Sequence, residues 1–206
     1  MKQGIARTIA ASGARFVEIA MMAPVPPYGQ KVPILAGGPA ASEFAERMTP
    51  YGMRIQVIAG EVGTVAATKM FRSIMVKGME ALMTECVLGA GRYGAEQAVF
   101  ASLTESYPGM DWKTLADYMI GRVVEHGERR AREMEEVAET LRSVGVEPIM
   151  AEATARRQDW AAQLGLASHF GPEGPASYRE VLEIVDAAPA RPLLQSSAGQ
   201  SSVDRK

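Results

Sequence analysis

The longest periodic segment of the chain runs from Gly60 to Arg92, where apolar residues recur every three or four positions. This spacing, entered through a glycine turn, predicts a long helix with a buried face. The predicted buried face comprises the residues at positions 67, 71, 74, 75, 78 or 79, 82, 83, 86, 87 and 90. The predicted polar face comprises Lys69, Arg72, Ser73, Lys77, Glu80 and Thr84.

Within this polar face, Lys69, Ser73 and Lys77 follow one another at intervals of four residues, which predicts one row along the first half of the helix. A row of this kind is typical of an exposed face on an amphipathic helix. Two lysines and a hydroxyl group close to a helix start also favour a functional interpretation. The pattern by itself leaves both interpretations open.

The segment before this helix alternates between short apolar runs and glycine- or proline-rich turns, which predicts a small α/β layer. Pro39 is expected to open a helix because proline is favoured at the first helical position. The predicted order is helix 2–12, strand 15–21, loop 24–29, strand 32–35, helix 39–47 and strand 53–58.

After residue 60 the periodic segments are helical, which predicts an all-α part. Asp111 is expected to cap a helix that starts at Trp112, because aspartate is a preferred N-cap residue. The highly charged run 121–143 is interpreted as a solvated helix face. Further helices are expected at 95–106, 148–163 and 178–185. The predicted organisation is an α/β domain at 1–59, an all-α domain at 60–187 and a disordered tail at 188–206, where alanine, proline, serine and glutamine dominate.

Composition excludes some classes of function and favours others. The chain has 206 residues, 47% of them hydrophobic and 22% charged, with a net charge of −2. A packed core is therefore expected, with no general attraction to nucleic acid or to an anionic membrane. No apolar run reaches the roughly 18 residues of a transmembrane helix, so no membrane partner is expected. The arginines are interleaved with glutamates and lack an aromatic platform, which argues against nucleic-acid binding.

The metal-binding and redox residues are few. Cys86 is the single cysteine, and the two histidines are His126 and His169. Without a cysteine and histidine cluster, no metal site is predicted. A lone cysteine cannot form a disulfide within the chain, which fits a reducing compartment and a cytoplasmic location.

Residues 60–73 (GEVGTVAATKMFRS) resemble the catalytic segment of the β-hydroxyacid dehydrogenase superfamily, which includes 3-hydroxyisobutyrate and 6-phosphogluconate dehydrogenases. Gly60, Gly63 and Lys69 match its glycine-x-x-glycine and lysine positions. The lysine–methionine pair at 69–70 is similar to that of the phosphogluconate enzymes. The resemblance implies that Lys69 is a catalytic residue.

Two further segments resemble the same superfamily. Residues 13–24 (GARFVEIAMMAP) are similar to a glycine–phenylalanine–aliphatic–aspartate segment, with Glu18 at the position where aspartate is usual. Residues 126–160 resemble the helical C-terminal domain of a bacterial branch of 6-phosphogluconate-dehydrogenase-like oxidoreductases. The implied fold is a remnant of a Rossmann-type parallel sheet followed by a helical C-terminal domain, over residues 1 to about 170.

The resemblance implies an NAD- or NADP-dependent oxidation of a small hydroxyacid-like substrate, with Lys69 as general acid and base. A lysine among apolar neighbours or beside another cation has its pKa lowered and can take the hydroxyl proton. Arg72 and Lys77 are candidate cations, and either could hold a substrate carboxylate. The expected substrate-binding residues are Arg72, Ser73, Lys77, Met22 and Ala23; the expected cofactor-binding residues, by their turn only, are Gly60 and Gly63.

Departures from the superfamily pattern limit what the resemblance implies about the substrate. Arg72 and Ser73 stand where asparagine, or histidine and asparagine, follow the lysine. Val65 replaces a glycine of the turn, and Met22 replaces the serine that holds the substrate. Because Met22 and Ala23 have no side-chain hydrogen-bond donor, the hydroxyacid or sugar acid of better-known relatives is not transferred to this chain.

The dinucleotide fingerprint GxGxxG does not occur in the sequence, and the glycine pair Gly37–Gly38 lacks its spacing. We therefore expect the chain to be the C-terminal part of a longer dehydrogenase. Two alternatives remain: a non-catalytic helical module that dimerises through Met79 and Met83, or a small-molecule-binding protein with its cleft beside Lys69. The superfamily resemblance also implies a homodimer formed through the helical domain.

Overall fold

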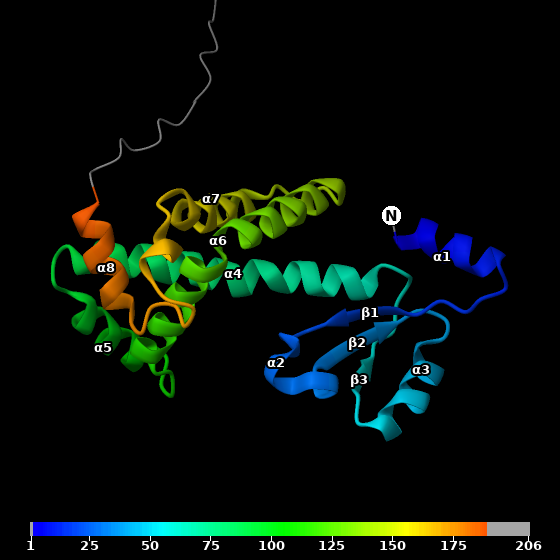
Figure 1. Ribbon diagram of the computed structural model, residues 1–206. Coiled ribbons are helices and arrows are strands. Elements are labelled where there is room, and N and C mark those ends of the chain that lie inside the picture. The colour runs from blue at the N-terminus through cyan, green and yellow to red at the C-terminus, as the bar shows by residue number, and fades with distance from the viewer. Residues whose placement is uncertain (1, 189–206) are drawn as a thin grey trace, which may run out of the picture.

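The computed structural model describes residues 2–188, in which one long helix joins a small α/β layer to a group of packed helices (Figure 1). The predicted α/β part followed by an all-α part is confirmed, whereas the predicted tail at 189–206 lies outside the described residues. The strands are β1 (Glu18–Met21), β2 (Pro33–Gly37) and β3 (Arg54–Val57). The helices are α1 (Lys2–Ala11), α2 (Val25–Tyr28), α3 (Ala41–Met48), α4 (Thr64–Gly91), α5 (Glu96–Ser106), α6 (Trp112–Ser143), α7 (Ile149–Gln163) and α8 (Tyr178–Ala187).

The sheet has the order β1-β2-β3 and is mixed, which corrects the predicted parallel sheet. β1 pairs antiparallel with β2, with Glu18 opposite Gly37, and β2 pairs parallel with β3, with Pro33 opposite Arg54. The β1–β2 connection holds only a short helical turn, α2, and a 3-10 turn at Gly29–Lys31, so the chain reverses direction. The β2–β3 connection contains α3, and a crossover of this kind permits parallel pairing.

The long helix α4 leaves the α/β layer and runs along α6 and α7 towards α5 and α8 (Figure 1). Its buried face differs from the predicted one in two respects. The polar residues Lys77, Glu80 and Thr84 are buried, at 6%, 2% and 2% exposure. Four residues assigned to the buried face are instead exposed: Phe71, Met75, Met79 and Leu82. The polar side turns inward because α6 and α7 supply partners for its charges, as described below.

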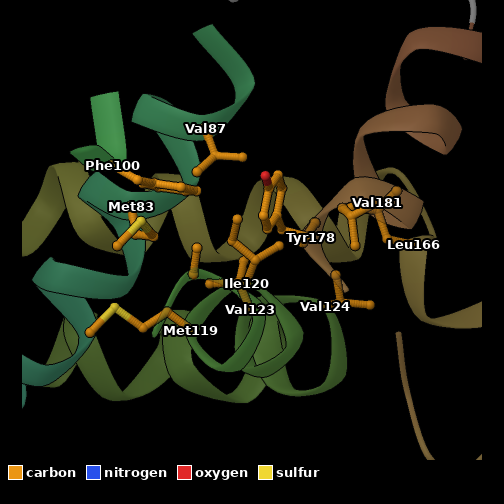
Figure 2. Close-up of a cluster of buried hydrophobic side chains, with 12 residues drawn as sticks. Met83, Val87, Phe100, Met119, Ile120, Val123, Val124, Leu166, Tyr178 and Val181 are labelled. Atoms are coloured by element: carbon orange, nitrogen blue, oxygen red, sulfur yellow. The ribbon is translucent and has the colours of Figure 1, made fainter. Parts of the chain in front are cut away.

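The helical core lies at the far end of α4, where residues from α4, α5, α6 and α8 pack together (Figure 2). Tyr178, the first residue of α8, is 1% exposed and meets Phe100 edge to face at a ring-centroid distance of 5.7 Å. The Tyr178 hydroxyl accepts a hydrogen bond from Gln97, and its backbone N–H donates to Asp117. These contacts hold α8 against α5 and α6. Over residues 2–188, the structure contains no helix that combines the length and the hydrophobicity needed to cross a membrane.

Candidate functional site

The junction between the α/β layer and α4 is built around Glu18 of β1. Its side chain is only 3% exposed, and both carboxylate oxygens accept backbone hydrogen bonds from the start of α4. Gly63 N–H donates to Oε2 at 2.8 Å, and Ala66 N–H donates to Oε1 at 3.2 Å. A carboxylate is stabilised there because the first N–H groups of a helix lack intrahelical partners and carry partial positive charge.

The same junction explains the valine that departs from the superfamily pattern. Val65 is 1% exposed and packs with a small apolar cluster that includes Ala20, Leu35 and, at its edge, Met22. A Cβ atom at Gly37 of β2 would lie 2.7 Å from a Val65 methyl carbon, closer than such atoms approach. Because Gly37 of β2 has no side chain, it leaves the space that the Val65 side chain occupies.

Lys69 lies one helical turn beyond Val65, and its side chain is exposed. Because Met22 at the end of β1 packs into the cluster of Val65, the end of β1 and the Lys69 turn lie at the same junction. Lys69 therefore lies one turn from the cluster that holds Met22 of the predicted substrate segment, but the described residues do not enclose it in the apolar surroundings that the sequence suggested. Its assignment as catalytic remains a prediction.

The other predicted site residues differ in their exposure and in the hydrogen bonds that their polar groups make. Arg72 is exposed. The Ser73 hydroxyl donates to the Lys69 backbone oxygen at 3.1 Å, within the helix itself. Met22 N–H donates to the Pro33 oxygen at 2.8 Å, while Ala23 is half-buried in the following loop. Their roles in substrate binding remain predictions.

Lys77, in contrast, points into the interface with α6. Its ammonium group lies 2.9 Å from Glu133 Oε2, and Glu133 also pairs with Arg129. Burial raises the pKa of Glu133, but Lys77 and Arg129 outweigh that effect and leave the pKa below its usual value. The charge of Lys77 is thus already paired inside the molecule, away from the exposed Lys69 and Arg72.

A second buried ion pair, which the sequence analysis missed, lies beside Lys77. Arg130 of α6 donates from Nε to Glu80 Oε2 at 3.0 Å and from a terminal nitrogen to Oε1. Gln158 of α7 is fully buried and donates to the same Oε2 at 3.1 Å. The interpretation of 121–143 as a solvated face is therefore wrong at Arg130, which is 5% exposed. No local signal marks this pair, because its partners lie 50 residues apart.

A hollow on the sheet extends the junction away from α4. It brings together the end of β1 with the first halves of β2 and β3, and Arg54 adds a cation that the sequence analysis did not consider. Its lining residues are Met22, Pro33, Ile34, Leu35, Arg54, Ile55 and Gln56. Apolar side chains, one guanidinium group and the Gln56 amide line this hollow, a mixture that could contact both the body and the carboxylate of a small acid.

The predicted cofactor turn is formed, but the described residues do not make a dinucleotide site. Gly60 and Gly63 have φ angles of 138° and 110°, which only glycine adopts readily. The N–H of Gly63, which could otherwise approach a phosphate, donates to Glu18. Among residues 2–188 there is also no group of three or more histidine, cysteine, aspartate or glutamate side chains arranged to hold a metal ion.

Comparison with known proteins matches residues 90–161 to a family described as a domain of unknown function, DUF1932. This region covers α5, α6 and most of α7. A curated relative, an uncharacterized 28.5 kDa protein in the 7S RNA 5′ region of Methanothermus fervidus, is 27% identical over 143 residues. That match covers 68% of this chain and 54% of the relative.

Solved structures extend the similarity to the α/β layer. A conserved hypothetical protein from Sinorhizobium meliloti 1021 is 38% identical with a TM-score of 0.74, over 89% of this chain and 61% of that one. The conserved protein MTH1747, whose structure is described as similar to 3-hydroxyacid dehydrogenases, is 31% identical with a TM-score of 0.68. That match covers 80% of this chain and 64% of MTH1747. A 3-hydroxyisobutyrate dehydrogenase from Salmonella typhimurium shares the fold at 16% identity and a TM-score of 0.59. That match covers 89% of this chain and 65% of the dehydrogenase.

The chain spans less than two thirds of the length of each of these four relatives. The similarity to the solved structures nevertheless extends over 80–89% of this chain. Together with the fold, these similarities support a relationship between this chain and a β-hydroxyacid dehydrogenase-like superfamily.

Proposed function

We propose that this chain is the part of an NAD(P)-dependent oxidoreductase of the β-hydroxyacid dehydrogenase type that carries the proton-transfer group, with Lys69 as general acid and base. The observation that carries the proposal is the position of Lys69. It matches the superfamily lysine and stands exposed one turn beyond the anchored start of α4, at the junction with β1.

In the proposed reaction the Lys69 amine accepts the hydroxyl proton of a small hydroxyacid. Arg72, exposed one turn further along α4, provides a cation for the substrate carboxylate. Met22 and Ala23 contribute apolar surface, which favours a small acid with an apolar body over a polyhydroxylated sugar acid. A bound nicotinamide would accept the hydride. A cytoplasmic location fits this role and the free thiol of Cys86.

The test begins with the purified 206-residue chain, titrated with NADH and NADPH while the fluorescence of the reduced nicotinamide is followed. Small β-hydroxyacids are then screened for nicotinamide reduction. We expect Lys69→Ala to lower turnover by roughly 10²- to 10⁴-fold, the usual contribution of a general acid–base group. The unfolding midpoint should stay unchanged because the side chain is exposed.

Lys2→Ala is the matched control, because Lys2 is also exposed but lies in α1, which contributes no residue to the junction. Full turnover in Lys69→Ala would refute the catalytic assignment. If wild-type protein binds a hydroxyacid and NAD(P) without turnover, and Lys69→Ala loses the hydroxyacid, the chain is a small-molecule-binding protein.

A second candidate function, a helical dimerisation module, is favoured by the exposed apolar residues of α4. Phe71, Met75, Met79 and Leu82 recur every three or four positions on the side opposite α6 and α7, at 38%, 65%, 36% and 57% exposure. We infer a homodimer through this stripe. The two functions are compatible, since dimerisation would leave Lys69 to its own chemistry.

A further inference from the structure

Glu18 is a buried charge that the proposed reaction does not use. It lies in the apolar run of residues 16–21 and is 3% exposed. A carboxylate removed from water costs free energy unless its oxygens are hydrogen-bonded. Both oxygens of Glu18 are satisfied by the start of α4, so its position in the strand is tied to that helix.

Among the described residues, Glu18 supplies the side-chain hydrogen bonds to the N–H groups at this start of α4. The N-cap residue is Gly63, which has no side chain to cap the helix. Gly60 and Gly63 both have positive φ angles, so the turn could adopt other conformations at little cost. The contact of Val65 with Gly37 sets how closely α4 approaches the sheet. Because an apolar contact is non-directional, the contact of Val65 with Gly37 does not set the rotation of α4 about its own axis.

We propose that Glu18 is a positioning residue for the Lys69 site. Its two hydrogen bonds, to Gly63 and Ala66, fix the rotation and height of the first turn of α4 on β1. Lys69 follows Ala66 by three residues, and Met22 follows Glu18 by four, so the same bonds set the placement of Lys69 relative to the substrate segment. This inference rests on the proposed function for the role of Lys69, whereas the positioning of α4 on β1 is a property of the fold.

The experiment compares Glu18→Gln with Glu61→Gln in the full chain. Glu61 lies in the same turn, but its side chain is exposed, so its variant makes the same chemical change without a buried carboxylate. Two signals are followed by NMR spectroscopy: hydrogen exchange of the Gly63 and Ala66 amides, and the methyl–methyl Overhauser effect between Met22 and Val65. The second signal reports on how the end of β1 sits against α4.

In Glu18→Gln, exchange at Gly63 and Ala66 should rise about tenfold or more, because hydrogen bonds to a charged acceptor are replaced by weaker ones. The Met22–Val65 signal should weaken while the helical core remains folded. Glu61→Gln should change neither signal. Glu18→Asp keeps the negative charge and should restore part of the protection. Unchanged protection and an unchanged Met22–Val65 signal in Glu18→Gln would overturn the inference.

If Glu18→Gln does not fold, Glu18→Asp is the deciding variant. Its carboxylate is one carbon shorter and should raise hydrogen exchange at Gly63 or Ala66. Wild-type protection at both amides in Glu18→Asp would overturn the inference. Neither signal requires a substrate or a cofactor, so the result does not depend on catalysis. Where wild-type protein turns over a hydroxyacid, Glu18→Gln should lower kcat more than it raises KM. Unchanged turnover in Lys69→Ala, with both signals still sensitive to Glu18, would refute the proposed function alone.

Discussion

Among single residues, exposure to solvent falls along the row of Lys69, Ser73 and Lys77 on α4. Residues four apart on a helix are rotated by about 40°, so the row winds around α4. Lys69 is exposed, Ser73 half-buried and Lys77 buried against Glu133. The two lysines therefore serve different purposes: the first is available to a ligand, and the second holds α4 to α6.

The buried pair Glu80–Arg130 allows a prediction about stability. Glu80→Ala should lower the free energy of unfolding by about 3–5 kcal/mol, because it leaves Arg130 charged, buried and without its bidentate partner. Removing both charges in the double variant Glu80→Leu, Arg130→Met should recover most of that loss. Urea unfolding followed by circular dichroism measures both, and a double variant as unstable as the single one would contradict the argument.

Among elements, α6 and α7 approach each other closely at Gly127. A Cβ atom at this position would overlap the backbone oxygen of Gln158 in α7, so the absence of a side chain lets the two helices touch. Gln158 in turn reaches Glu80 of α4. The three helices thus share one contact region, and their spacing depends on this glycine.

Gly127→Ala should therefore lower the free energy of unfolding by about 1–3 kcal/mol through overpacking, despite the better helix propensity of alanine. The matched control is Gly89→Ala in α4, where a Cβ atom would meet open space. That variant should raise stability by up to about 1 kcal/mol. Thermal unfolding of the two variants tests the difference, and stabilisation by both would show that α6 and α7 are not held at this spacing.

For the whole molecule, α4 also carries apolar residues on the side that α6 and α7 leave uncovered. A contiguous apolar surface that no other element covers is typical of an interaction site. The exposed stripe of Phe71, Met75, Met79 and Leu82 is therefore the surface we propose to meet a second copy. Met83, which the sequence analysis placed in the interface, is 6% exposed and belongs to the helical core instead.

The double variant Met75→Glu, Leu82→Glu should convert a dimer into a folded monomer, because it places charge at the centre of the stripe. Met150→Glu is the control, since Met150 is exposed on α7 and lies off the stripe. Light scattering coupled to size-exclusion chromatography measures the mass. A monomeric wild-type protein, or a double variant that remains dimeric, would exclude this interface.

The sequence alone determined the kinds of the longer elements and most of their ends, although α2 lies within a predicted loop and α3 begins at Ala41 instead of Pro39. Hydrophobic spacing, prolines and caps act over a few residues, so their signals survive without the fold. Asp111, predicted to cap a helix from Trp112, accepts the Thr114 N–H at 3.0 Å, as expected. The α/β-to-α order and the position of Lys69 at the start of the long helix were also visible in the sequence.

Only the tertiary structure decided which side of α4 is buried, which way β1 runs and what holds the junction. Each depends on a partner distant in sequence: Glu133 for Lys77, Arg130 and Gln158 for Glu80, and β2 for β1. Glu18 meets Gly63 across 45 residues. A buried charge is stable only with its partner, and periodicity within one helix carries no information about a partner on another.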